Sequence, residues 1–150
     1  MSNVFDRLYQ GSHAITELSS VVVHLVRERP LCDTRTARDL FFAYIAVVQE
    51  HLDLVDRHLF QPLLARPEAE VHHTAEDFKT DAREVRRVFS EYVVRWSSVK
   101  QRRLVVGSDH HQFVEETEAV LGIVLDHVQR EIEGLFPLAR QYGKAPAIAA

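Results

Sequence analysis

The sequence predicts an all-α protein, an antiparallel up-down-up-down four-helix bundle. Three observations predict this class. Apolar residues recur at helical spacing, as in the stripe from Val85 to Trp96, which advances in steps of four, three and four residues. Glycine and proline are scarce, five of each in 150 residues, and they fall where helix ends are expected. No stretch of useful length alternates apolar and polar residues as a strand does.

The first two helices are expected at about 13–29 and 34–65. Ser12, after Gly11, has a suitable side chain for the N-cap of the first helix, and Pro30 ends it. Asp33 or Thr34 can cap the second helix, and Pro67 follows it. The short link between the two helices predicts that they pack as antiparallel neighbours.

The third and fourth helices are expected at about 74–105 and 109–142. Thr74 is a candidate N-cap for the third helix, and Gly107-Ser108-Asp109 reads as the turn that follows it. Gly143 is a natural C-cap for the fourth helix, and the last seven residues are expected to fray. At this length the chain, 1–150, forms one domain with one core.

Composition excludes several classes of function. A net charge of -4 and a pI near 6.1 provide no basic surface for nucleic acid. The longest apolar run, 40–48, is far shorter than a membrane span, and the single cysteine, Cys32, cannot form an internal disulfide. Asp6 and Arg7 interrupt the N-terminal segment where a signal peptide would be apolar. The expectation is a cytoplasmic protein with no nucleic-acid or membrane partner. The chain also lacks a P-loop or a nucleophile elbow, so it is not expected to be an enzyme.

Nine histidines are the unusual feature of the composition. His51 and His127 each lie nine residues before a phenylalanine that is soon followed by a proline. The second and fourth helices run the same way in the predicted bundle, so this echo puts His51 and His127 at one level. In two antiparallel helices joined by a short turn, residues at the same height have numbers that add up to about twice the residue number at the turn. This rule puts His13 of the first helix at the same height as His51 and His127.

Carboxylates accompany these histidines. Glu131 follows His127 by four residues, as Glu17 follows His13, and this spacing puts both side chains on one helical face. His51 has Val55 at that position, and its nearest acid is Asp56, five residues on. Histidine and carboxylate on facing helices can bind a metal in a bundle core. The alternative is that each histidine is an interior residue bonded to a backbone carbonyl or a neighbour.

The candidate metal ligands are therefore His13, His51, Asp56, His127 and Glu131. The third helix carries no histidine at the common level and offers only Glu84 or Glu91. Imidazole and carboxylate together suit iron, manganese or zinc.

Several segments resemble the hemerythrin-like (HHE cation-binding) domain family. They are Gly11-Ser12-His13, 50–64 (EHLDLVDRHLFQPLL), 75–96 and 127–139 (HVQREIEGLFPLA). The resemblance covers about residues 11–142. It implies a non-haem di-iron or mixed-metal site in a four-helix bundle, in oxygen binding, iron handling, or redox or nitric oxide response. His13, His51, His127 and Glu131 match ligand positions of the family.

Two departures from the family pattern leave two hypotheses. Val55 stands where the family has a glutamate, and the histidine of the third helix is missing. One hypothesis is a metal-binding protein that takes O2 or another small diatomic molecule. The other is a metal-free bundle that acts as a regulatory or protein-interaction module. Such a module could form a homodimer or meet a partner through Arg83, Arg86, Arg87 and residues 101–103.

Overall fold

A computed structural model describes residues 3–142 of the chain, and 85% of these residues are helical. The protein is therefore all-α, as predicted. The helices are α1 (Val4–Arg27), α2 (Arg29–Cys32), α3 (Arg35–Val55), η1 (Asp56–Phe60), α4 (Gln61–Leu64), α5 (Ala69–Trp96), α6 (His110–Arg130), η2 (Glu131–Leu135) and α7 (Phe136–Tyr142). A two-stranded antiparallel hairpin, β1 (Ser97–Ser98) and β2 (Arg103–Leu104), joins α5 to α6.

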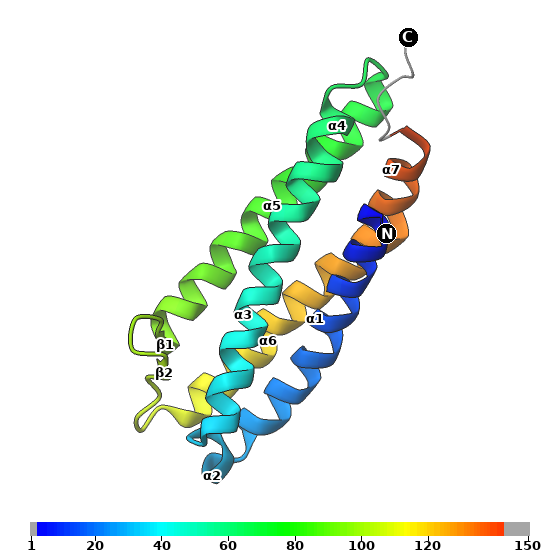
Figure 1. The fold of residues 1–150 in the computed structure, drawn as a ribbon. Coiled ribbons are helices and arrows are strands. Elements are labelled where there is room, and N and C mark those ends of the chain that lie inside the picture. Colours follow the sequence, from blue (N-terminus) through cyan, green and yellow to red (C-terminus); the bar gives the residue numbers. More distant parts are fainter. Residues whose placement is uncertain (1–2, 143–150) are drawn as a thin grey trace.

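The long helices lie side by side, and successive ones run in opposite directions (Figure 1). Helix α1 packs against α3 and α6, and α5 packs against α6 and, over a shorter stretch, α3. The chain turns at α2, at the α4–α5 link and at the β1–β2 hairpin. No helix in the described part of the chain is long and apolar enough to cross a membrane.

Helix α1 begins nine residues earlier than predicted, at Val4. The side chain of Asn3 caps it by accepting a hydrogen bond from the Asp6 backbone N–H at 2.9 Å. Ser12 is therefore not an N-cap; it lies inside the helix, where its hydroxyl donates to the Leu8 carbonyl at 2.9 Å. An isolated glycine such as Gly11 costs a helix only about 1 kcal/mol, and the burial of Leu8 outweighs that cost.

The predicted bounds of α3 and α6 hold better than those of α5. Thr34 caps α3, as predicted, and accepts from the Ala37 N–H at 3.2 Å. Helix α5 begins at Ala69 rather than Thr74 and ends at Trp96 rather than near residue 105. The apolar stripe stops at Trp96, and the polar residues beyond it bend into the hairpin. Helix α6 follows the predicted turn at Asp109, whereas the predicted C-cap, Gly143, lies outside the described residues.

Two π-helices interrupt the helices at corresponding places. In η1 the Gln61 N–H bonds to the Asp56 carbonyl, and in η2 the Phe136 N–H bonds to the Glu131 carbonyl, five residues back in each case. Each π-helix is followed within two residues by a proline, Pro62 or Pro137. A proline ring clashes with the carbonyl four residues before it, and a wider turn relieves that clash. The sequence echo thus corresponds to a repeated local structure.

Buried apolar residues form two separate clusters. The larger has 21 buried members and fills the half of the molecule near the hairpin; they include Ile15, Phe41, Phe89, Phe113 and Val124. The smaller has 11 buried members, which include Leu8, Phe60, Val71, Leu135 and Phe136, at the end near α4 and α7. Between the two clusters lie the buried polar side chains of His51, His127 and Glu131.

Candidate metal centre

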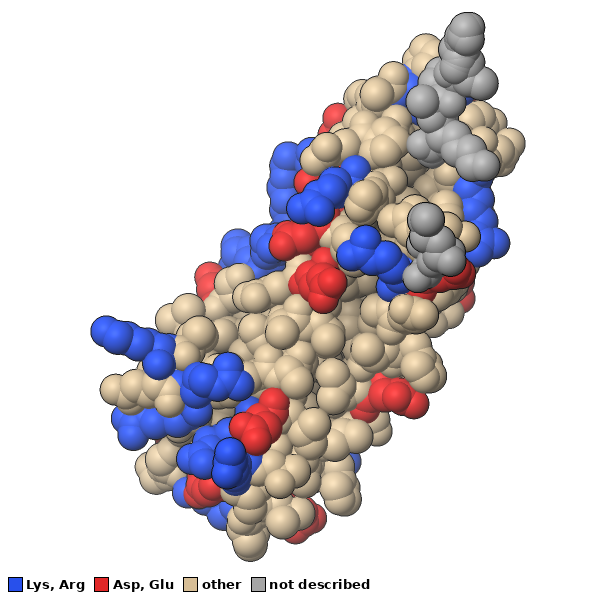
Figure 2. Space-filling model, viewed as in Figure 1, with Lys and Arg blue, Asp and Glu red and all other residues tan. Residues whose placement is uncertain are grey.

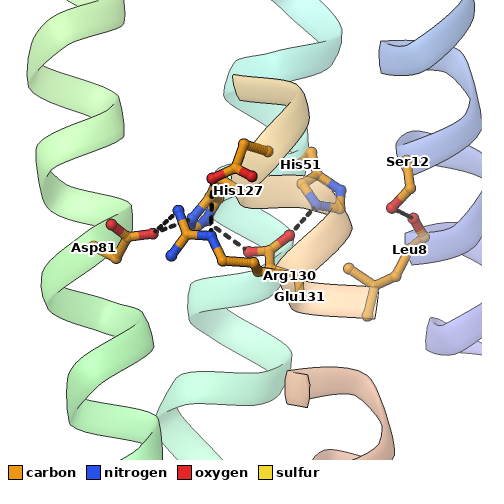
Figure 3. Close-up of polar contacts among 8 residues, drawn as sticks. Leu8, Ser12, His51, Asp81, His127, Arg130 and Glu131 are labelled. Atoms are coloured by element: carbon orange, nitrogen blue, oxygen red, sulfur yellow. Dashed lines mark hydrogen bonds and ion pairs between the residues drawn. The ribbon is translucent and has the colours of Figure 1, made fainter. Parts of the chain in front are cut away.

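Three of the predicted ligands meet in the interior. His51 comes from α3, His127 from α6, and Glu131 from the first position of η2, and their exposed fractions are 2%, 1% and 0%. His51 Nε2 lies 2.8 Å from Glu131 Oε1, and His127 Nε2 lies 3.0 Å from Glu131 Oε2. One carboxylate therefore bridges two imidazoles from different helices (Figure 3). All three groups are buried away from water.

The two contacts to Glu131 differ in quality. His51 Nε2 and Glu131 Oε1 form a hydrogen bond. His127 Nε2 and Glu131 Oε2 are close but too poorly aligned for one, so both atoms lack a hydrogen-bond partner. His51 Nδ1 is a third buried atom without a partner. Unpartnered buried polar atoms are rare in proteins and each requires an explanation.

Asp81 on α5 extends the cluster towards the surface. Its Oδ2 accepts a hydrogen bond from His127 Nδ1 at 2.8 Å and also lies 2.9 Å from Arg130 Nη2. Arg130 in turn contacts Asp126 at 3.1 Å. The continuous polar chain in Figure 3 thus runs from half-exposed Asp81 through His127 and Glu131 to His51. Asp81 fixes the His127 ring with Nε2 facing Glu131.

The sequence prediction missed Asp81 because it misplaced both ends of α5. With the predicted ends of the third helix, the residue at the height of His51 and His127 was expected near position 87. This expectation favoured Glu84 and Glu91 as ligands from that helix. Those two glutamates are exposed and pair with Arg87 on their own helix. With the observed ends of α5, the same arithmetic points to the neighbourhood of Asp81.

The charges of the cluster stabilise one another. Burial alone raises the pKa of Glu131, but the close contact and charge of His127 and the hydrogen bond and charge of His51 outweigh it and leave that pKa below its usual value. Burial likewise lowers the pKa of His127, and contacts with Glu131 and then Asp81 reverse the shift and raise it. The ionised form of Glu131 is therefore favoured inside the protein.

His13 and Asp56 do not join this cluster, so the prediction that they share a site with His51 is corrected. The His13 side chain is 73% exposed and contacts Glu17 at 3.2 Å. Its predicted height is right, because Gly11, two residues earlier, lies against the His51 ring. The predicted face is wrong, since the core face of α1 carries Ser12.

Asp56 is 45% exposed and accepts a hydrogen bond from the Gln61 amide at 3.2 Å. It lies 4.0 Å from Lys79 and begins η1. Five residues after His51, it has turned about 140° around the helix, away from the core. Val55 takes the position facing inward and packs in the smaller apolar cluster.

The residues present fit a single metal ion better than a pair. Two unpartnered ligand atoms, His127 Nε2 and Glu131 Oε2, lie 3.0 Å apart, about the separation of neighbouring ligands around an ion with bonds of roughly 2.1 Å. His51 Nε2 lies against the other oxygen of the same carboxylate. A second ion would need another bridging carboxylate, and Val55 cannot supply one.

The three side chains are not already in ligating positions. Within residues 3–142, no group of three or more His, Cys, Asp or Glu side chains is arranged so that it could hold a metal ion. His51 and His127 point at different oxygens of Glu131, so a rotation of this carboxylate has to precede coordination by all three.

Comparison with known proteins provides no independent identification. No protein-family model matches the chain, and no curated protein or solved structure matches it significantly. The function is therefore inferred from the side chains of the protein itself.

Proposed function

We propose that this chain is a hemerythrin-like antiparallel four-helix bundle that binds one divalent metal ion through His51, His127 and Glu131. The observation that carries the proposal is the pair of unpartnered ligand atoms, His127 Nε2 and Glu131 Oε2, buried 3.0 Å apart beside a second imidazole. A buried polar cluster without complete hydrogen bonding costs stability. Coordination would satisfy these atoms.

Each residue has a defined part in the proposed site. His51 and His127 donate the lone pairs of Nε2, and Glu131 donates a carboxylate oxygen. Asp81 accepts the Nδ1 proton of His127, an arrangement that orients a ligating imidazole and increases its basicity. Iron held by two histidines and one carboxylate supplies open coordination positions for O2 or another small diatomic molecule. Manganese or zinc suits the same ligands.

The second candidate, a metal-free interaction module, is favoured by one surface feature. Lys and Arg side chains gather near the β1–β2 end of the molecule in Figure 2. Exposed Lys100, Arg102 and Arg103 lie there beside Val99, which is 60% exposed, so the hairpin offers a basic and partly apolar surface to a protein partner. In contrast, Arg86 and Arg87 are paired within the molecule.

A thermal-shift experiment tests the metal proposal. Fe(II) added without oxygen, or Zn(II), should raise the Tm of the wild-type protein by roughly 5–10 °C at about a hundredfold excess over Kd, because metal binds only the folded state. His127→Ala should abolish this rise. His73→Ala is the matched control, since His73 and Asp77 form an exposed pair at the same i,i+4 spacing as His127 and Glu131.

The outcome separates the two candidates. A metal-induced rise that survives in His127→Ala but disappears in His73→Ala would locate binding at the surface and refute the buried site. No rise with iron, manganese or zinc would leave the interaction module as the better reading. Calorimetric titration at 25 °C provides the same comparison if His127→Ala has too low a Tm for the scan.

A further inference from the structure

A pocket of about 320 Å³ opens on the side of the molecule where α3 and η1 face α5. Helix α5 contacts α3, η1 and α4 along this side (Figure 1). Small-molecule sites are typically clefts of about 300–1,000 Å³, so the pocket is large enough for a small ligand. None of His51, His127 and Glu131 lines it, so binding there is separate from the proposed metal centre.

The π-helix η1 supplies much of one wall of this pocket. Asp56, Arg57 and Phe60 belong to η1, and Gln61 is its C-cap. A π-helix pairs residues five apart, and here the Gln61 amide also donates to the Asp56 carboxylate at 3.2 Å. π-helical turns frequently occur at functional sites, and η1 contains no residue of the proposed metal centre. Its wide turn is therefore available to shape a different site.

The side chains that line the pocket carry more positive than negative charge. The cations are Arg57, Lys79, Arg83 and Arg86, and the acids are Asp53 and Asp56. Asp53 is paired with Arg86, whose Nη2 atom lies 2.9 Å from Asp53 Oδ1. Asp56 accepts from the Gln61 amide and lies 4.0 Å from Lys79. Each acid already has a cation beside it, so two positive charges are left over.

Those two charges belong to Arg57 and Arg83. Both side chains are exposed, and within residues 3–142 neither forms an ion pair or a side-chain hydrogen bond. Arg57 comes from η1 and Arg83 from α5, so they line the pocket from its two walls. A guanidinium group binds phosphate or carboxylate oxygens through two parallel N–H groups. Leu52, Phe60 and Ala82 add apolar surface to the same pocket.

We propose that this pocket binds a small organic phosphate monoester. Such a group carries between about -1.5 and -2 charges at pH 7, which matches the two unpaired guanidinium groups. Arg57 and Arg83 would bind the phosphoryl oxygens, and the apolar lining would contact the organic part. The whole chain has a net charge of -4, so the attraction for an anion has to be local to these side chains.

Calorimetric titration with phenyl phosphate, without added metal and at an ionic strength of about 0.15 M, tests this site. Phenyl phosphate is the probe because it joins a phosphate monoester to an apolar ring. Arg57→Gln and Arg83→Gln should each weaken its affinity by about tenfold or more, because each removes a charge-assisted contact. Both residues are exposed, so circular dichroism should show an unchanged fold.

Arg87→Gln is the matched control. It removes the same charge from the same helix as Arg83→Gln, but Arg87 does not line the pocket and is paired with Glu84 and Glu91. It should change the affinity by less than about twofold. Asp53→Asn tests the site in the opposite direction, since it removes an acid and releases Arg86. It should tighten binding by about 2- to 5-fold, and a gain of this kind cannot come from a loss of folding.

Other outcomes would overturn the phosphate ester site. Equal weakening by Arg57→Gln, Arg83→Gln and Arg87→Gln would show only a general attraction between the anion and solvated arginines. Inorganic phosphate that binds as tightly as phenyl phosphate would refute the organic ester, and benzoate that does so would make the ligand a carboxylate. No binding of phenyl phosphate up to about 10 mM would refute the site altogether. The metal proposal would be unaffected, because its own test uses metal ions and His127.

Discussion

Glu131 is fully buried between two imidazoles, and a carboxylate in such a place is stable only while it keeps its partners. Its ionised form accepts from His51 and faces the Nε2 atom of His127. Removing one member of a buried charged pair usually costs more than the pair contributes, because the remaining charge stays unpaired. The contribution of Glu131 to folding should therefore be measurable without any metal.

Glu131→Gln should lower the free energy of unfolding of the metal-free protein by about 1–3 kcal/mol, because the neutral amide bonds less well to the two imidazoles. Urea denaturation measures this change. Glu133→Gln, an exposed position in the same π-helix, should change it by less than about 0.5 kcal/mol. Equal effects of the two substitutions would show that the buried carboxylate is not stabilised by its neighbours.

Cys32 offers a second test at a single residue. It is fully buried, and burial, followed by the nearby charge of Asp33, raises the pKa of its thiol. The thiolate is the reactive form, so a thiol reagent at pH 8 should label native Cys32 far more slowly than the unfolded chain. Rapid labelling of the native protein would contradict the burial of Cys32, the last residue of α2, in the larger apolar cluster.

The residues of the buried polar cluster were predictable to different degrees. His127 and Glu131 are four residues apart on one helix, so their spacing determines both height and face. The echo with 127–138 placed His51 correctly. For His13 the turn arithmetic determined height but not face, because α1 starts nine residues earlier than predicted. Asp56 was chosen as the acid nearest His51, although a step of five residues turns it about 140° around the helix and away from the core. The close approach of Gly11 to the His51 ring, where an added Cβ would stand 3.2 Å from Nδ1, is revealed only by the packing of α1 on α3.

Among the elements, the π-helices are the least expected feature and they lie beside the candidate site. η2 begins at Glu131 itself, and η1 begins five residues after His51. π-helices frequently occur at functional sites. The apolar periodicity predicted the long helices well, because the pattern repeats over many turns. A π-helical turn is a single wide turn, which is too short for a periodic pattern to indicate it.

Deletion of one residue provides a test of η2. Removing Glu133 should convert the π-helix to a regular α-helical turn and keep Leu135 and Phe136 in the core, so the protein should remain folded. Glu84 is an exposed residue in α5, which is a regular α-helix. Its removal should rotate the core-facing residues before it by about 100° relative to those after it, so the protein should unfold. Circular dichroism and thermal melting distinguish the two. Equal loss of structure in both would contradict the assignment of η2.

Over the whole molecule, the polar cluster divides the apolar interior into unequal halves. Among the described residues, the cluster near the hairpin has 21 buried apolar members and the cluster near α4 and α7 has 11. The smaller half buries less apolar area, so it should open more readily. The all-α class was predictable from apolar spacing, but this division was not, because it arises where polar side chains from two helices meet.

Hydrogen exchange tests this division. Amides of α4 and α7 should exchange at a lower opening free energy than those in the middle of α3 and α6. Zn(II), by linking α3 to α6 at the boundary, should slow exchange in the smaller half more than in the larger one. Uniform protection across both halves would mean that the molecule opens as one cooperative unit.

The paired π-helices also affect how this protein should be aligned. A π-helical turn contains one residue more than an α-helical turn, so each is equivalent to a single-residue insertion. A relative built from regular helices would need a one-residue gap within 56–60 and another within 131–135. An ungapped alignment extended through either segment would shift Phe60 or Phe136 by one position, about 100° around the helix. The core pattern of this chain would then appear lost in a relative that keeps it.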